Sequence, residues 1–370
     1  MDDSRRFHMV EAEGIGLVFD ASAGMIRKLA VAREGRRIEP LHTAPWVDEP
    51  DIQGDETLPP HLRTLSGDFF CAPFGLNDVE PAPMHGWPCN AAWTMIETAR
   101  QPSGGVTARF ALERPVFGAR LVKELTLRDG HPFLYQRHVF TGGSGAITAA
   151  HHAMTRMPHG GRLSFSPKAY AETPAAAPES DPAMGRSSLR YPSRTEDLGA
   201  IALARGGAVD LRDYPVAERS EDFVMLVEAL GRRLGWAAAL RHGTNDLVLS
   251  LKDPAVLPLT LLWMSNGGRD YRPWNGRHTG VLGMEEARCY SALGHAASIA
   301  DNPLSRSGIA TSFELGGTVE IRSVLGGVPV PAGWRDISSV EPGPEGLRIA
   351  DASGAAMTVG YDAAFLFPQA

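Results

Sequence analysis

Cysteine is scarce in this chain, which has three in 370 residues: Cys71, Cys89 and Cys289. An odd number at such wide spacing is neither a disulfide framework nor a zinc-binding pattern, and it is typical of a reducing compartment. Long apolar runs are also missing, since none approaches the roughly 20 residues of a membrane span. The charged N-terminus has no apolar signal-peptide segment. We therefore expect a cytoplasmic protein that does not enter a membrane.

The chain also lacks an excess of basic residues. The formal net charge is −7, and arginines are scattered rather than gathered in runs. A surface that binds phosphate backbones would normally be basic, so nucleic acid is not an expected partner. The apolar and charged fractions, 43% and 21%, are those of an ordinary globular protein.

Helical periodicity is scarce, whereas 40 glycines and 28 prolines separate short apolar runs. Several runs alternate with period two: Leu121, Lys123 and Leu125 fall on one face of a strand, and Val122 and Glu124 on the other. This alternation predicts an all-β, mainly antiparallel sandwich or barrel. The segment SEDFVMLVEALGRRLG is compatible with either a helix or a strand.

The chain shows neither a repeat of fixed period nor a dividing linker. Strand-like segments lie on both sides of a stretch at about 165–197 that is rich in Ala, Pro and Ser. We expect a single domain over 1–370, with that stretch as a surface excursion that could flank a cleft.

Polar and aromatic side chains gather in four segments: 67–93, the pair at 151–152, 218–226 and 261–290. Tryptophan covers the C–H faces of a pyranose, and Asn, Arg, Asp and His hydrogen-bond its hydroxyls. This chemistry predicts a site for a monosaccharide or sugar derivative. The candidate substrate-binding residues in these segments are His85, Trp87, Asn90, His151, Asp222, Asn266, Trp274, Arg277 and His278.

The adjacent histidines, His151 and His152, must face opposite sides of a strand. His152 shares its face with the larger Met154 and Arg156, so we expect it to face a pocket, with His151 in a supporting role. The reverse assignment stays open. Metal sites on β-sandwiches usually use His-x-His, which places both rings on one face. We therefore expect no metal, and no other cofactor.

The order of these segments resembles the aldose 1-epimerase, or galactose mutarotase-like, family. MHGWPCN is similar to the family's early His-Gly segment, and HHAM falls where the family has a catalytic histidine. EDFVML is similar to its Asp-containing segment, and VLGMEEA falls where it carries a catalytic glutamate. The resemblance implies a β-supersandwich and an isomerase that interconverts sugar anomers.

The resemblance also implies roles. Glu285 would be the catalytic base, His152 the acid, and His85 and Asp222 would orient hydroxyls. Removing a proton from the anomeric hydroxyl and delivering one to the ring oxygen needs no metal.

This chain departs from the family pattern, which indicates a divergent member. It lacks the early Asn-Arg pair, for which Arg63 could substitute, and Glu286 stands where proline is common, so Glu285 and Glu286 both remain candidates. A non-catalytic carbohydrate-binding or sugar-sensing protein is the main alternative, and a polysaccharide lyase or hydrolase module is a third. The arginines of GGRDYRPWNGR would suit an acidic or phosphorylated sugar.

Overall fold

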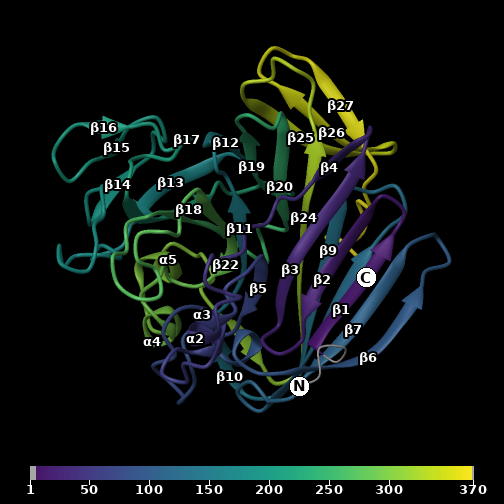
Figure 1. Cartoon of the computed structure of the whole chain (residues 1–370), viewed down its shortest axis with the longest axis horizontal. Helices are drawn as coiled ribbons and strands as arrows, with labels where there is room; N and C mark the ends of the chain where they lie inside the picture. The colour runs from purple at the N-terminus through teal and green to yellow at the C-terminus, as the bar shows by residue number, and fades with distance from the viewer. Residues whose placement is uncertain (1–5, 369–370) are drawn as a thin grey trace.

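The computed structural model describes residues 6–368 and consists mainly of antiparallel sheets (Figure 1). The all-β prediction is confirmed. The largest sheet has 11 strands. Its strands in spatial order are β1 (Phe7–Ala12), β2 (Ile15–Asp20), β3 (Met25–Arg33), β5 (Asp68–Cys71), β11 (Ala149–Arg156), β22 (Val281–Arg288), β21 (Leu259–Asn266), β18 (Ser220–Glu228), β13 (Lys168–Thr173) and β14 (Ser193–Thr195), with β4 (Arg36–Ile38) beside β3.

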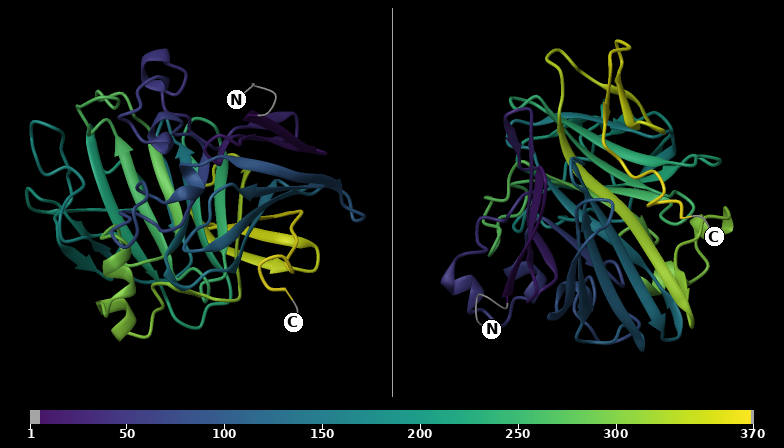
Figure 2. Two further views of the ribbon diagram at one scale, coloured as in Figure 1. Left: turned by 90° about the horizontal axis from the view of Figure 1, so that it is seen from below. Right: turned by 90° about the vertical axis from the view of Figure 1, so that its right-hand side faces the viewer.

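A nine-stranded sheet forms the second layer, and Figure 2 shows the two layers from two sides. Its strands in spatial order are β17 (Asp213–Tyr214), β12 (Gly161–Phe165), β19 (Gly235–Arg241), β20 (Asp246–Lys252), β24 (Thr318–Pro329), β9 (Phe133–Gly142), β8 (Ala119–Leu127), β7 (Val106–Leu112) and β6 (Trp93–Arg100).

Three small sheets and a few short helices complete the fold. The sheets are β25 (Ile337–Gly343), β26 (Gly346–Asp351) and β27 (Ala356–Val359); β10 (Gly145–Ile147) with β23 (Phe313–Leu315); and β15 (Ile201–Ala202) with β16 (Ala208–Val209). The helices are α2 (Pro50–Gln53), α3 (Pro60–Arg63), α4 (His295–Ile299), α5 (Pro303–Arg306) and the 3₁₀ helix η1 (Trp87–Cys89). Among the described residues, no helix is long and apolar enough to cross a membrane.

The main core lies between the two large sheets and follows the alternation of the strands. Leu121 and Leu125 of β8 point into it, as do Val224 and Leu226 of β18. Lys123 shares the inward face of β8, as the alternation predicts, and its ammonium donates to the carbonyl of Gly24 at 3.0 Å. A second apolar cluster covers the opposite face of the 11-stranded sheet, where Met225, Leu261 and Trp263 lie.

The structure decides two expectations about strands: the ambiguous segment after residue 219, and the stretch at 165–197. The segment that was compatible with a helix or a strand forms β18, which is buried along its whole length between β13 and β21. The stretch at 165–197 differs from the expected surface excursion at both ends, because residues 168–173 form β13 and residues 193–195 form β14 in the 11-stranded sheet. Fully buried strands in a sheet covered on both faces need no polar alternation, which is why β18 could not be told from a helix.

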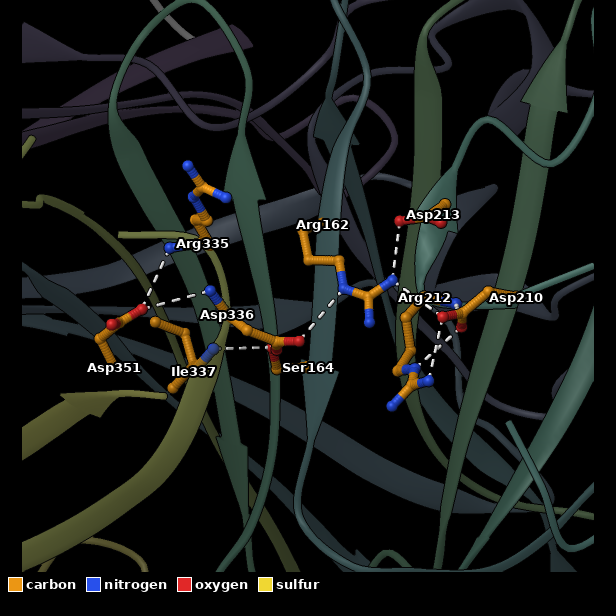
Figure 3. Close-up of polar contacts among 9 residues, drawn as sticks. All are labelled: Arg162, Ser164, Asp210, Arg212, Asp213, Arg335, Asp336, Ile337 and Asp351. Carbon is orange, nitrogen blue, oxygen red and sulfur yellow. Dashed lines mark hydrogen bonds and ion pairs between the residues drawn. The ribbon is translucent and has the colours of Figure 1, made fainter. Parts of the chain in front are cut away.

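The C-terminal sheet β25–β27 is held to the nine-stranded sheet by polar contacts from β12 (Figure 3). Ser164 donates to the carboxylate of Asp336, and its hydroxyl accepts from the Ile337 N–H at 3.0 Å. Arg162 Nε contacts Asp336 at 3.2 Å. Asp351 in turn accepts from the Asp336 N–H at 3.3 Å. These contacts fix the start of β25 against β12.

A buried ion network joins the two large sheets. Lys252 of β20 contacts Glu286 Oε2 at 2.5 Å and Glu228 Oε1 at 3.0 Å, and it donates to Thr260 Oγ1 at 2.9 Å. Thr260 donates to Glu286 Oε2 at 2.9 Å. Lys168 pairs with Glu228 from the other side. Because all of these groups are shielded from water, removing one leaves an uncompensated buried charge.

We therefore expect Lys252→Met to lower the free energy of unfolding by about 3–5 kcal/mol, measured by urea denaturation. The matched control is Arg306→Met, which breaks an exposed ion pair with Asp301 (2.8 Å) and should cost at most about 1 kcal/mol. Equal effects of the two substitutions would contradict the structural role of the network.

Candidate functional site

A cavity of about 650 Å³ opens on the face of the 11-stranded sheet that points away from the nine-stranded sheet. Strands β5, β11, β18, β21 and β22 supply its floor, and loops supply its walls. Its size suits a small organic ligand. The polar and aromatic side chains that line it are His61, Phe69, Phe74, His85, His152, Phe223, Trp263, Arg269, Tyr271, Trp274 and Glu285.

An imidazole and a carboxylate meet on the cavity floor. The antiparallel register of β11 and β22 places His152 directly opposite Glu285, and Nε2 of the histidine lies 3.2 Å from Oε1 of the glutamate. The ring of His152 stacks on Phe69 at 4.3 Å between centroids. A Cβ at Gly283 would lie 2.8 Å from this carboxylate oxygen and 2.9 Å from Trp263. A glycine at 283 therefore leaves the space in which the carboxylate sits.

The Glu285 carboxylate has no hydrogen-bond donor among the described residues, although both its oxygens are buried. Burial raises the pKa of Glu285 well above its usual value, and the negative charge of Asp68 adds to the shift. Burial lowers the pKa of His152 to about 3. Burial therefore favours a protonated carboxyl group beside a neutral imidazole. A proton donor and a proton acceptor therefore lie 3.2 Å apart on the cavity floor.

Two further histidines extend a row from this pair. The ring centroid of His85 lies 5.6 Å from that of His152, and that of His61 lies 5.4 Å from His85. The Gly75 N–H donates to His85 Nδ1 at 3.3 Å, which leaves the proton of a neutral ring on Nε2. His61 Nδ1 lies 2.9 Å from Oδ1 of Asn90, so the histidine donates to that amide oxygen. Asn90 thus orients His61 from behind the cavity wall.

The turn that carries His85 has an uncommon backbone. His85 has φ 66°, and Gly86 follows with φ 75°. A Cβ at Gly86 would lie 2.0 Å from the carbonyl oxygen of Ala72. Only glycine allows this close approach to the end of β5, and a non-glycine residue in the left-handed region costs of order 1 kcal/mol. Strain of this kind is often found where a side chain must be aimed at a ligand.

The other side of the cavity holds Arg269, whose positive charge is balanced by two neighbouring carboxylates. Arg269 Nε contacts Glu179 at 2.7 Å, and its Nη1 lies 3.4 Å from Glu221. Its guanidinium lies over the ring of Trp274 at 4.5 Å. Glu221 also accepts from the indole N–H of Trp263. Arg269 is the one lysine or arginine among the described residues that line the cavity, and two carboxylates already contact it.

The structure places His151 and Glu286 on the interlayer face, opposite the cavity. They face each other across β11 and β22 just as His152 and Glu285 do. The ring of His151 packs against His138 at 4.9 Å and Phe70 at 5.2 Å, and Glu286 belongs to the Lys252 network. The alternation of side chains therefore resolves both adjacent pairs.

Several residues predicted to bind substrate lie outside the cavity lining because other contacts hold them. Asp222 lies on the interlayer face of β18, where it accepts from the N–H groups of Ser188 and Leu189. Trp87 packs under Arg114 at 4.5 Å. Arg63 Nη1 donates to the carbonyl of Gln53 at 3.0 Å. None of these three side chains lines the cavity.

The same holds for three predicted residues of the segment 261–290. Arg277 forms a bidentate pair with Glu49 at 2.5 and 2.8 Å, which ties the loop to the start of α2. Asn266 accepts from the Gly280 N–H at 3.1 Å. His278 lies behind Trp263, stacked on it at 5.4 Å between ring centroids. Of the predicted substrate-binding residues, His85 and Trp274 line the cavity.

His61, Glu221 and Trp263 were not predicted from the sequence as site residues. His61 lies in the short helix α3, within LPPHLR, and no motif marks it. Glu221 had a usable signal, because it shares the alternate face of β18 with Phe223, which lines the cavity. Applying strict alternation to that strand would have selected Glu221 over its neighbour Asp222.

No family model matches the sequence, and no curated protein matches it. Solved structures do match. A Salmonella typhimurium protein (YeaD) provisionally assigned as a mutarotase superposes with TM-score 0.55 and 11% identity, over 87% of this chain and 90% of that one. A provisionally assigned aldose 1-epimerase from Escherichia coli K12 gives TM-score 0.55 and 10% identity, over 88% and 99%. The fold is galactose mutarotase-like.

Galactose 1-epimerase from Lactobacillus acidophilus NCFM also has the galactose mutarotase-like fold, with TM-score 0.50 and 11% identity over 87% of this chain and 94% of that one. The predicted resemblance and fold class are thereby confirmed. Since identities near 11% establish the fold alone, the chemistry has to be argued from the cavity of this chain.

The buried imidazole of His151 provides a test of the two-faced arrangement. Burial lowers its pKa to about 3, whereas an unfolded histidine titrates near 6.5. Between these values the unfolded state binds one more proton at this position, so stability falls as the pH decreases.

We expect His151→Phe to remove this contribution. The pH dependence of the unfolding free energy near pH 5 should become shallower by about 1.4 kcal/mol per pH unit, measured by urea denaturation at several pH values. The control is Phe140→Leu, a core change that removes no titratable group and should shift stability without changing the slope. An unchanged slope in His151→Phe would show that His151 is solvated.

Proposed function

We propose that this protein interconverts the anomers of a neutral aldose in the cavity. The observation that carries the proposal is the buried Glu285 carboxylate, which lacks a hydrogen-bond donor and lies 3.2 Å from His152. An unsatisfied buried carboxyl group is costly unless a ligand completes it. A sugar hydroxyl is a donor that would do so.

The proposed reaction uses only the two side chains and the sugar. The anomeric hydroxyl gives its proton to one member of the pair, while the other member gives a proton to the ring oxygen. The bond between C1 and the ring oxygen breaks, which yields the open-chain aldehyde. Rotation about C1–C2 and the reverse proton transfers close the ring with the other configuration.

The environment favours one starting assignment. Because burial favours neutral Glu285 and neutral His152, the carboxyl group starts as the acid and the imidazole as the base. This is the reverse of the roles that the family resemblance implies. On ring closure the ring oxygen returns its proton to Glu285 and His152 returns its proton to the C1 oxygen, which restores the neutral pair.

The charge in the cavity supports a neutral sugar. Arg269 is already in contact with Glu179 and Glu221, and Arg277 is paired with Glu49 outside the cavity. Arg272, the third arginine of the segment that suggested an acidic or phosphorylated sugar, pairs with Asp55, so all three already have carboxylate partners. An anionic substrate would approach two carboxylates without gaining a free cation.

A second candidate is a binding protein that holds a sugar without chemistry. The observation that favours it is the complete burial of both Glu285 oxygens beneath the cavity surface. In that case the carboxyl group would serve packing and the cavity would only bind. Catalysis separates the two candidates.

We expect Glu285→Gln and His152→Gln each to reduce anomeric exchange by at least about 100-fold, because each removes one proton-transfer group. Exchange would be measured by saturation-transfer NMR between the C1 protons of the two anomers, on a panel of neutral and anionic aldoses. The double variant should be little slower than the slower single variant, since the pair acts as a unit.

The matched controls are Glu56→Gln and His159→Gln, which change the same residue types at exposed positions and should keep the wild-type rate. Binding of sugars by the wild type without acceleration of exchange would instead establish the binding-protein candidate. Wild-type activity in Glu285→Gln would remove the pair from the mechanism.

We also expect discrimination by charge. Glucose 6-phosphate and glucuronate should bind at least about 10-fold more weakly than glucose, because of the carboxylates beside Arg269. Isothermal titration calorimetry at low salt would measure this ratio. Tighter binding of the anionic sugars would contradict the statement that Glu179 and Glu221 already balance the charge of Arg269.

A further inference from the structure

The cavity mouth carries three large apolar side chains that face water. Leu76 is 51% exposed, Met84 43% and Leu293 37%, and all three line the cavity. We call them the apolar rim. Single exposed leucines are ordinary on protein surfaces, but a group of them around one opening marks a place where apolar surface is covered on binding.

Backbone hydrogen bonds hold the segments of the rim in place. The His85 N–H donates to the carbonyl of Gly75 at 2.8 Å, which joins the Met84 segment to the Leu76 segment. The His295 N–H donates to the carbonyl of Leu76 at 3.0 Å, which joins the segment after Leu293. The rim is therefore built into the fold next to His85.

Below the rim much of the cavity wall is apolar. Leu62, Leu65, Phe74 and Phe223 line it, and Pro174 and the segment 176–178 close another side. The polar groups of the lining are the row of His61, His85 and His152 with Glu285 and, on the other side, Arg269 and Tyr271. The cavity thus combines the polar His152–Glu285 pair on its floor with many apolar side chains in its wall and rim.

The volume agrees with this division. About 650 Å³ lies in the middle of the range for sites that hold drug-sized ligands, and a single hexose is smaller than such a ligand. A free sugar would leave the apolar wall and the rim in contact with water. Burial of that wall and rim would then contribute nothing to its binding.

We infer that the substrate is a neutral aldose that carries an apolar substituent, such as an acyl or alkyl group, at a position remote from C1. The placement of the ring on the floor rests on the proposed function. The anomeric hydroxyl stays free for proton transfer, and the substituent runs along the apolar wall to the rim.

The test compares D-glucose and D-galactose with their 6-O-hexanoyl esters, because the 6-position is remote from the anomeric carbon. Dissociation constants would be measured by isothermal titration calorimetry. We expect each ester to bind at least about 10-fold more tightly than its free sugar, since each buried methylene is worth about fourfold in affinity. The double variant Leu76→Ser/Leu293→Ser should lose most of this preference.

The control is Leu230→Ser, which changes a leucine that is 87% exposed and does not line the cavity; it should keep the ester preference. Equal affinity for ester and free sugar would overturn the inference, as would a preference that survives in the double rim variant. Lack of binding by all four sugars would overturn both proposals. A preference that depends on the rim, without anomeric exchange, would support the inference while the catalytic proposal fails.

Discussion

The antiparallel register between β11 and β22 is the constraint on which the candidate site depends. It sets two adjacent histidines against two adjacent glutamates, and the alternation of strand side chains then sends one of each to either face. One face receives the His152–Glu285 pair at the cavity, and the other receives His151 and the Glu286 of the ion network. A slip of one residue would exchange these environments.

The two faces use buried charge differently. Between the sheets, Glu286 is balanced by Lys252 and by the hydroxyl of Thr260, so its charge is satisfied and serves the structure. In the cavity, Glu285 has neither a lysine nor a hydrogen-bond donor among the described residues. A carboxyl group left in this state is suited to exchanging a proton with a ligand. The same residue type therefore has two functions that depend on its partners.

More of the fold than of the candidate site could be predicted from the sequence. Period-two alternation such as that of residues 121–127 specified antiparallel strands, and the order of short motifs indicated the fold. The alternation of side chains along the strand also predicted that His152, rather than His151, faces the pocket. Contacts between residues far apart in the sequence could not be predicted. Trp87, Arg63 and Arg277 were chosen for their residue types. In the structure Trp87 packs under Arg114, Arg63 donates to Gln53, and Arg277 pairs with Glu49. Asn90 holds the His61 ring toward the cavity through a hydrogen bond, and no local sequence pattern predicts that contact.

The most direct test of the acid–base pair is a crystal structure of the Glu285→Gln variant with a bound aldose. We expect the C1 hydroxyl and the ring oxygen to lie within hydrogen-bond reach, about 2.6–3.2 Å, of the side chains at 285 and 152. A sugar bound in the cavity with C1 turned toward solvent, or bound elsewhere on the protein, would contradict it.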